Sequence, residues 1–294
     1  MPVPQPAETI LSPSLADNIG YLLHRTFQQV QAIHAEADTR PHPRELAIVS
    51  RLLAIGPQPQ HELALVLSVN RSVMVHLLDS LERQGLVARE RNPHDRRSHL
   101  VSATEGGAAA LARAAPEMLA ADERVTERRS VAKRDRLYAL LGALLGPALP
   151  DVAAPISRTV TYRIARAHFL LAARANRALQ PVGLDVREYG LMTSVRDLGP
   201  CSQHEIATRL DVSGPVIVEL VDALEARNLV MRERNQEDRR SYALRLSAEG
   251  EALLTRASTA IEAALTEASQ EIGRAGMLRL AALLRELLGA GTAG

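Results

Sequence analysis

Two clusters of arginine occupy corresponding places in the two halves of this 294-residue chain. Segment 83–97 has five arginines against two acidic residues, and segment 226–240 has five against three. Because the whole chain carries a net charge of only +1, its positive charge is concentrated at these two places. The flat guanidinium fork of arginine matches the oxygens of a phosphate group. The clusters are therefore candidate phosphate-binding surfaces, and the alternative is a pair of solvated charged hairpins.

The arginine clusters belong to a longer internal repeat. Residues 56–98 reappear as residues 199–241 at a constant offset of 143, with 24 of 43 positions identical and no gap. The best-matched pieces of the first copy are 60–62, 79–82 and 89–98. Since homo-oligomers are most often two-fold symmetric, the repeat indicates a dimer whose two halves have been fused into one chain.

Helices must position both clusters. Apolar residues recur with a period near 3.6 along much of the chain, and Gly-Pro at 56–57 and at 199–200 marks a helix end. The first copy is predicted to have helices at 15–37, 44–55, 61–67, 71–84, 104–129 and 133–145. The second copy is predicted to begin with a helix at 156–179 and to end with helices at 247–275 and 277–288.

In each copy, two short helices in quick succession precede the arginine cluster. After Gly85, residues 86–89, a charged tip and residues 99–101 predict a short β-hairpin with a long turn. Two helices, a tight turn between them and a charged hairpin form a winged helix-turn-helix, whose second helix can enter a DNA major groove. We therefore expect a mainly α-helical protein with small β-wings, made of two fused winged helix-turn-helix domains in a pseudo-two-fold arrangement.

Composition limits the other possibilities. The single cysteine, Cys201, excludes an internal disulfide. No apolar run reaches the roughly 18 residues of a membrane span, and no export signal is visible, so a cytoplasmic protein is expected. No metal-ligand spacing, cofactor loop or catalytic set stands out, so we expect no metal, no cofactor and no enzymatic activity. The predicted organisation is a flexible leader at 1–14, a first repeat at 15–145, a linker at 146–155 and a second repeat at 156–294.

A family resemblance follows from three motifs in each copy. The first copy has Leu-Glu-Arg-Gln-Gly-Leu-Val at 81–87, Asp-Arg-Arg at 95–97 and Thr-Glu-Gly-Gly at 104–107. The second copy has Leu-Glu-Ala-Arg-Asn-Leu-Val, Asp-Arg-Arg and Ser-Ala-Glu-Gly at the matching positions. This pattern resembles the MarR family of bacterial transcription regulators over nearly the whole chain after the leader. The resemblance implies a dimer built through terminal helices, a DNA-binding lobe on each side and often a small-molecule pocket between these regions.

The pattern and the resemblance together give candidate DNA-binding residues. The candidate residues of the recognition helices, which we call reading helices, are Asn70, Arg71, Ser72 and His76 in the first copy and Ser213, Gly214 and Pro215 in the second. The candidate wing residues are Arg89, Arg91, Asp95, Arg96 and Arg97 in the first copy and Arg232, Arg234, Asp238, Arg239 and Arg240 in the second. The resemblance implies that Arg97 and Arg240 contact DNA, and that Asp95 and Asp238 hold the wing arginines in place.

The two reading helices differ in chemistry. Arg71 can reach a phosphate or a guanine edge, whereas its counterpart Gly214 cannot, and His76 is replaced by Glu219. We expect an asymmetric operator, or one half that binds mainly through its wing. The expected protein is a single-chain pseudo-dimer that binds double-stranded promoter DNA, acts as a repressor and responds to a small organic effector.

Other residues allow more than one interpretation. The aromatic residues and histidines where the resemblance places an effector pocket are Tyr21, His24, Phe27, Tyr162 and His168, and packing in a helical core is the alternative. Cys201 is predicted to be a structural thiol rather than a redox sensor. Tandem winged helices also occur in plasmid replication initiators, and winged helices also act as protein-interaction modules that never touch DNA. Both remain alternatives.

Overall fold

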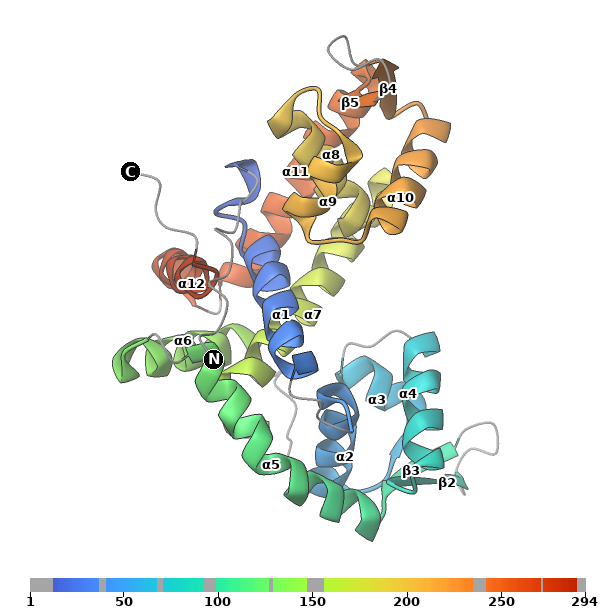
Figure 1. Ribbon diagram of the computed structural model, residues 1–294, viewed down its shortest axis with the longest axis vertical. Helices are drawn as coiled ribbons and strands as arrows, with labels where there is room; N and C mark the ends of the chain where they lie inside the picture. The colour runs from blue at the N-terminus through green and yellow to red at the C-terminus, as the bar shows by residue number, and fades with distance from the viewer. Residues whose placement is uncertain are drawn as a thin grey trace. The chain divides into compact units, whose positions relative to one another are not determined.

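The computed structural model describes residues 13–36, 41–67, 71–92, 99–126, 129–146, 156–234, 242–270 and 272–289. Most of these residues are helical, and the strands form two small antiparallel sheets (Figure 1). The predicted mainly α-helical fold with small β-wings is confirmed. The chain divides into two compact units, one of residues 29–170 and one of residues 1–28 together with 171–294.

The elements follow the same order in both copies. The first copy contains η1 (Pro13–Leu15), α1 (Ile19–Glu36), α2 (Pro43–Ile55), β1 (Gln58–Pro59), α3 (Gln60–Val66), α4 (Arg71–Arg83), β2 (Val87–Arg91), β3 (His99–Ala103), α5 (Glu105–Thr126) and α6 (Val131–Leu145). The second copy contains η3 (Ile156–Arg158), α7 (Val160–Leu179), η4 (Gln180–Val182), α8 (Val186–Leu198), α9 (Gln203–Leu210), α10 (Gly214–Ala226), β4 (Val230–Arg234), β5 (Tyr242–Leu246), α11 (Ala248–Ser269) and α12 (Gly273–Leu287).

Both predicted wings are antiparallel hairpins. β2 pairs with β3 in a register that places Val87 opposite Ala103, and β4 pairs with β5 with Val230 opposite Leu246. Val87 and Val230 are buried where each hairpin leaves the reading helix. In the first copy β1 adds a short third strand beside β3, whereas the second copy has only a bridge between Cys201 and Leu244 at that place among its described residues.

Helix starts are set by side-chain caps, and this corrects two predicted boundaries. The first helix begins at Ile19, four residues later than predicted, because the Asn18 side chain accepts the Tyr21 N–H at 3.1 Å and caps it there. Pro13–Leu15 forms a separate 3-10 turn, inside the end of the predicted leader, and the Ser14 N–H donates to Asp197 at 2.9 Å. The helix predicted from Ile156 likewise begins at Val160, after a 3-10 turn.

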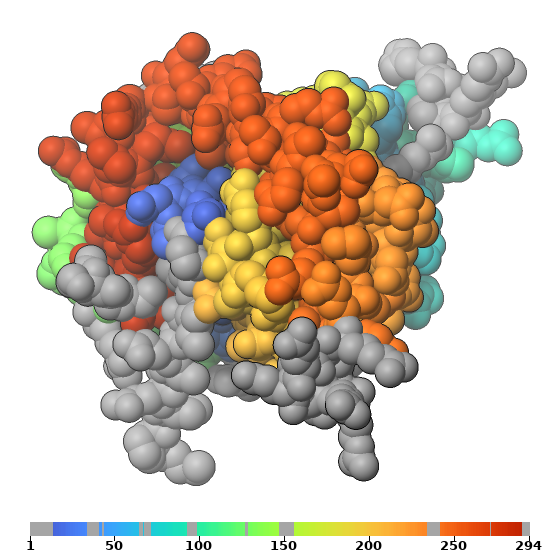
Figure 2. All heavy atoms as spheres, turned by 90° about the horizontal axis from the view of Figure 1, so that it is seen from above, coloured from blue at the N-terminus to red at the C-terminus, as the bar shows by residue number. Residues whose placement is uncertain are grey.

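The compact units do not coincide with the two copies of the sequence. The turn η1 and the first part of α1 pack with the second copy, because Leu15 and Tyr21 belong to the same buried cluster as residues of α8, α9, α10 and α11. Figure 2 shows atoms of this N-terminal segment, in blue, set between yellow and red atoms of later segments of the same unit. Reciprocally, Ile156 and Tyr162 at the start of the second copy belong to the buried cluster of the first. Each winged helix is therefore completed by a helix from the other copy.

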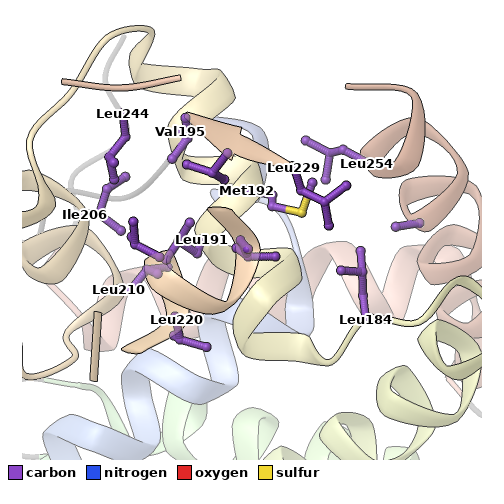
Figure 3. Close-up of a cluster of buried hydrophobic side chains, with 14 of the residues drawn as sticks. Leu184, Leu191, Met192, Val195, Ile206, Leu210, Leu220, Leu229, Leu244 and Leu254 are labelled. Carbon is purple, nitrogen blue, oxygen red and sulfur yellow. The ribbon is translucent and has the colours of Figure 1, made fainter. Parts of the chain in front are cut away.

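Each unit has its own apolar core beneath its helix-turn-helix. In the second copy, leucine, isoleucine, valine and methionine side chains from α8, α9, α10 and β5 converge between the helices (Figure 3). Leu191, Met192, Ile206 and Leu244 are fully buried there. Burying a side chain of this size stabilises the folded state by about 1.5–3 kcal/mol, so the core fixes the helices that carry the reading surface.

Candidate nucleic-acid interface

The first reading helix, α4, presents polar side chains to solvent. Ser72 and His76 are exposed, while the apolar residues on the opposite side of α4 are buried in the core. Both lie on one face because they are four residues apart. Arg71 begins the helix, but its side chain lies outside the described part of the structure, as does the whole of Asn70.

The second reading helix, α10, has a different exposed face. Ser213, Gly214 and Pro215 form its exposed first turn, and Pro215 is compatible with that position because the first turn needs no backbone donor there. Val218 and Glu219 are also exposed. α10 contains three acidic residues and no basic one. The face of α10 that could approach a base pair is therefore apolar and acidic.

A surface hollow of about 650 Å³ lies beside the first turn of α10. Its lining residues come from α9, from the turn and from α10, and they are Gln203, His204, Ala207, Thr208, Asp211, Val212, Ser213, Gly214 and Val218. A methyl group added at Gly214 would meet no atom within 4 Å, so this side of the hollow is open. At the position that matches Gly214, the first copy has the large side chain of Arg71.

One arginine of each wing is bonded to its own reading helix. Arg89 lies 2.6 Å from Asp79 and 3.3 Å from Glu82, both on α4. We call this group the wing ion cluster. Its side chains position β2 against α4 through charge-assisted bonds at a partly buried site. Arg89 is one of the candidate wing residues, and the structure places its guanidinium against α4.

The second copy repeats the wing ion cluster. Arg232 pairs with Asp222 at 2.5 Å and with Glu225, both on α10. Burial opposes the charge of Arg232, but the bonds to Asp222 and Glu225 outweigh it and raise the pKa of the guanidinium above its ordinary value. The cluster explains why the Asp-x-Leu-Glu motif occurs in both copies. The acidic residues of that motif, seven and ten residues before an arginine, were the signal that could have revealed the pairing.

The outer parts of the wings carry the remaining candidates. Arg91 is exposed at the end of β2, opposite His99, where it can reach a phosphate. Arg234 takes the matching place at the end of β4, opposite Tyr242. Its side chain lies outside the described part of the structure. The tip residues Asp95, Arg96, Arg97, Asp238, Arg239 and Arg240 also lie outside the described residues.

Within each copy, the same hydrogen-bonded junction joins the wing, the end of the reading helix and the long helix that follows. The Thr104 hydroxyl donates to the Gly85 carbonyl at 2.6 Å and accepts from the Gly107 N–H at 3.0 Å. The Ser247 hydroxyl makes the same two bonds, to Asn228 at 2.5 Å and from Gly250 at 2.9 Å. These caps hold α5 and α11 against the ends of the two reading helices.

The junction also explains the glycines of the predicted Thr/Ser-x-x-Gly motif. A methyl group at Gly107 would lie 2.3 Å from the Leu86 carbonyl oxygen, and one at Gly250 would lie 2.1 Å from that of Leu229. Both distances are far inside van der Waals contact. Only glycine allows the two backbones to approach this closely.

The candidate effector residues lie in two different units. Tyr21 and Phe27 are buried, and the Tyr21 hydroxyl donates to the Arg209 carbonyl at 2.7 Å. Burial lowers the pKa of His24, although a bond with the backbone of Leu210 opposes this effect. Tyr21 and His24 therefore contact the end of α9. The structure supports the packing interpretation for this pair.

The other two candidates come from α7. Tyr162 is buried in the core of the first winged helix. His168 is half-buried, and its ring centroid lies 5.1 Å from that of Phe169. The guanidinium of Arg44 stands 5.2 Å from the Phe169 ring centroid. These contacts place both residues in packing positions.

Cys201 is buried, and desolvation raises the pKa of its thiol to about 11. A thiol of this kind is almost entirely protonated at neutral pH, which supports the structural interpretation. In the described ranges, no group of three or more His, Cys, Asp or Glu side chains could hold a metal ion. No described helix has both the length and the apolar character needed to cross a bilayer.

Known proteins similar to this chain are helix-turn-helix regulators. The model of the MarR family matches residues 42–99 and again residues 184–242. A candidate transcriptional regulatory protein for the hcr operon of Thauera aromatica is 32% identical over 136 residues, covering 45% of this chain and 81% of that protein. The uncharacterised helix-turn-helix regulator YwoH of Bacillus subtilis is 31% identical over 96 residues, covering 33% of this chain and 69% of its own length.

Among solved structures, the transcriptional repressor CouR bound to a 23-mer DNA duplex is 30% identical, with a TM-score of 0.43, over 45% of this chain and 94% of CouR. The two separate matches of the family model fall on the two winged helices described above. The chain belongs to the MarR family and contains the family's winged helix-turn-helix twice.

Proposed function

We propose that this protein is a transcription regulator that binds double-stranded operator DNA in a sequence-specific way and acts as a repressor. The observation that carries the proposal is the repeated combination of an exposed reading-helix face and a wing that is joined to that helix by the wing ion cluster. Membership of the MarR family supports it. We propose that the single chain acts as a pseudo-dimer, with the two reading helices on half-sites one helical turn, about 34 Å, apart.

The two half-sites of the proposed operator differ. α4 offers Ser72, His76 and the preceding Arg71, which suit polar base edges and phosphates. α10 offers Val218, which suits a thymine methyl group, and Glu219, which suits a cytosine amino group. We propose that Arg91 and Arg234, together with the wing tips, hold both lobes on the backbone whatever the bases.

A small organic effector is the second proposed partner. The family often has a small-molecule pocket between its dimer-forming and DNA-binding regions, and we propose that such a ligand relieves repression. Tyr21 and His24 contact the end of α9, so a ligand that enters this region competes with contacts that the helix-turn-helix uses. A regulator of this kind acts where the chromosome is, and we propose the cytoplasm as its location.

Selection from a randomised duplex pool at physiological salt tests the proposal. We expect one enriched site with two unequal half-sites about 10 base pairs apart, centre to centre. In a separate footprinting experiment, protection of repeated origin sequences rather than of a promoter would favour a replication initiator. Equal recovery of all sequences, with and without cell extract as a source of effector, would contradict sequence-specific binding.

A further inference from the structure

The C-terminal end of α9 is covered by polar side chains of α1, which comes from the other copy of the repeat. The Tyr21 hydroxyl and the Arg25 guanidinium both donate to the carbonyl oxygen of Arg209, the former at 2.7 Å. The Gln28 amide donates to the carbonyl of Asp211 at 3.4 Å. We call this group of bonds the α1–α9 contact.

The α1–α9 contact meets a physical need of α9. The last carbonyls of a helix have no partner within the helix, and they carry the negative end of its dipole. A guanidinium is therefore favourable at this place. Arg25 is only 9% exposed, so its charge is removed from water and depends on the carbonyl and on Tyr21, whose hydroxyl lies 3.3 Å away.

The end of α9 also decides where the reading helix begins. Asp211 adopts a left-handed conformation with φ of 55°, and α10 starts only three residues later, at Gly214. Ser213 occupies the N-cap position of α10 but makes no side-chain cap bond. Since α10 lacks this local cap, the turn that precedes it fixes its position, and the α1–α9 contact holds that turn.

The same pair of residues recurs on the corresponding helix of the second copy. Tyr21 and Arg25 are four residues apart on α1, and Tyr162 and Arg166 have the same spacing on α7. Tyr162 and Arg166 are both buried in the unit that contains the first winged helix. The pair therefore occurs twice, each time on a helix that completes the winged helix of the other copy.

We infer that Tyr21 and Arg25 are positioning residues for the second reading helix, so that base selection by α10 depends on a helix of the first copy. The inference rests on the proposed DNA binding, and it goes further by assigning the control of the half-site read by α10 to a helix of the first copy. Tyr21 and Arg25 do not touch DNA in this arrangement. They act through Arg209, Asp211 and the turn.

The test uses the full chain with Tyr21→Phe and Arg25→Met, separately and together. Tyr21→Phe removes only the hydroxyl. Arg25→Met removes the guanidinium and fills the buried site with an unbranched, uncharged side chain. Duplexes that differ in one half-site compete for the protein, and the ratio of their affinities measures base preference. We expect the double variant to show an about tenfold smaller ratio for the half read by α10 and little change for the other half. Because no phosphate contact is removed, the salt dependence of affinity should not change.

Two further variants serve as controls. Tyr162→Phe should leave the preference in the half read by α10 unchanged, because Tyr162 belongs to the unit of the first winged helix. Thr26→Val removes a buried hydroxyl whose bond lies within α1 itself, to the Leu22 carbonyl at 2.8 Å, and it should leave both half-sites unchanged. Equal losses from Thr26→Val and Tyr21→Phe, at matched melting temperature, would overturn the inference because general destabilisation would then explain both.

Amide hydrogen exchange at residues 212–217 gives a readout that does not require DNA. We expect exchange in the double variant to be about tenfold faster there and unchanged in the core of α11. Unchanged exchange and unchanged half-site preference would overturn the inference while leaving DNA binding intact. If the unmodified protein selects no sequence, the proposed function fails, and unchanged exchange at 212–217 would then overturn the positioning role independently.

Discussion

The two winged helices share a scaffold but present different reading surfaces. Both have the wing ion cluster, the Thr or Ser junction and a glycine pressed against the reading-helix turn. The reading helices α4 and α10 differ in sequence at Arg71 against Gly214 and at His76 against Glu219. Positions that hold the fold have been kept in both copies, and positions that could meet bases have changed. Fusion of the copies permits this, because each half can then change without its partner.

The largest effect is expected from substitutions of the two glycines, Gly107 and Gly250, at which both copies share a close backbone contact. Gly250→Ala places a methyl group 2.1 Å from the Leu229 carbonyl, and Gly107→Ala does the same at 2.3 Å from Leu86, so each should lower the free energy of unfolding by about 3 kcal/mol. Thermal unfolding measures the loss. Gly214→Ala is the matched control, because its methyl group meets nothing within 4 Å. A large loss for only one of the two scaffold glycines would show that the junctions are not equivalent.

The next effect concerns the feature that both wings share. Arg91→Glu combined with Arg234→Glu should weaken binding to selected and unrelated duplexes alike, by about a hundredfold, and should lower the salt slope by about two. The affinity is measured at several salt concentrations. Arg113→Glu combined with Arg256→Glu is the control, since these exposed arginines occupy matching places on α5 and α11. If both pairs weaken binding equally, the wings have no special role.

A smaller effect sharpens the difference between the reading helices. Gly214→Arg gives α10 the residue that α4 has, in a place with open space around it. We expect about tenfold tighter binding and a selected site whose halves are more alike, because one base or phosphate contact is added. Gly214→Ala adds bulk without charge and should change neither. A selected site as asymmetric as before would place the asymmetry elsewhere than at this position.

The smallest expected effect concerns a buried position at which the two copies differ, Gln58 in the first and Cys201 in the second. In the first copy the Gln58 side chain accepts from Arg51 at 2.9 Å, whereas the second copy has Cys201 at that place, with a pKa of about 11. Native Cys201 should react with iodoacetamide at pH 7.5 about a hundredfold more slowly than in the urea-unfolded chain. Because the folded state keeps the thiol protonated, this contribution to stability is present below about pH 9 and is lost as pH rises to about 11. Cys201→Ala should leave DNA affinity unchanged within about twofold.

The sequence was sufficient for features that depend on local patterns. The 3.6-residue periodicity, the Gly-Pro stops and the hairpin pattern predicted the helices and both wings, and the repeat predicted two winged helices. Helix starts were less certain, because Asn18 rather than the first apolar residue caps α1.

Features that depend on contacts between residues far apart in the chain could not be predicted from local sequence patterns. The ion pairs of Arg89 and Arg232 with their reading helices were not predicted, because the acidic partners lie on another element. The contacts of Tyr21 and His24 could not be foreseen, because nothing nearby in sequence shows that α1 meets the end of α9, more than 180 residues away.

The completion of each winged helix by the other copy has a consequence for synthesis on the ribosome. The unit of residues 29–170 has all its parts once residue 170 has emerged. The other unit combines residues up to 28 with residues as late as Ile261 in its core. At 5–20 residues per second, roughly 10 to 50 seconds separate the translation of these two parts. The first winged helix can therefore fold during translation, whereas the N-terminal part of α1 can pack against the second winged helix only after that domain has been synthesised.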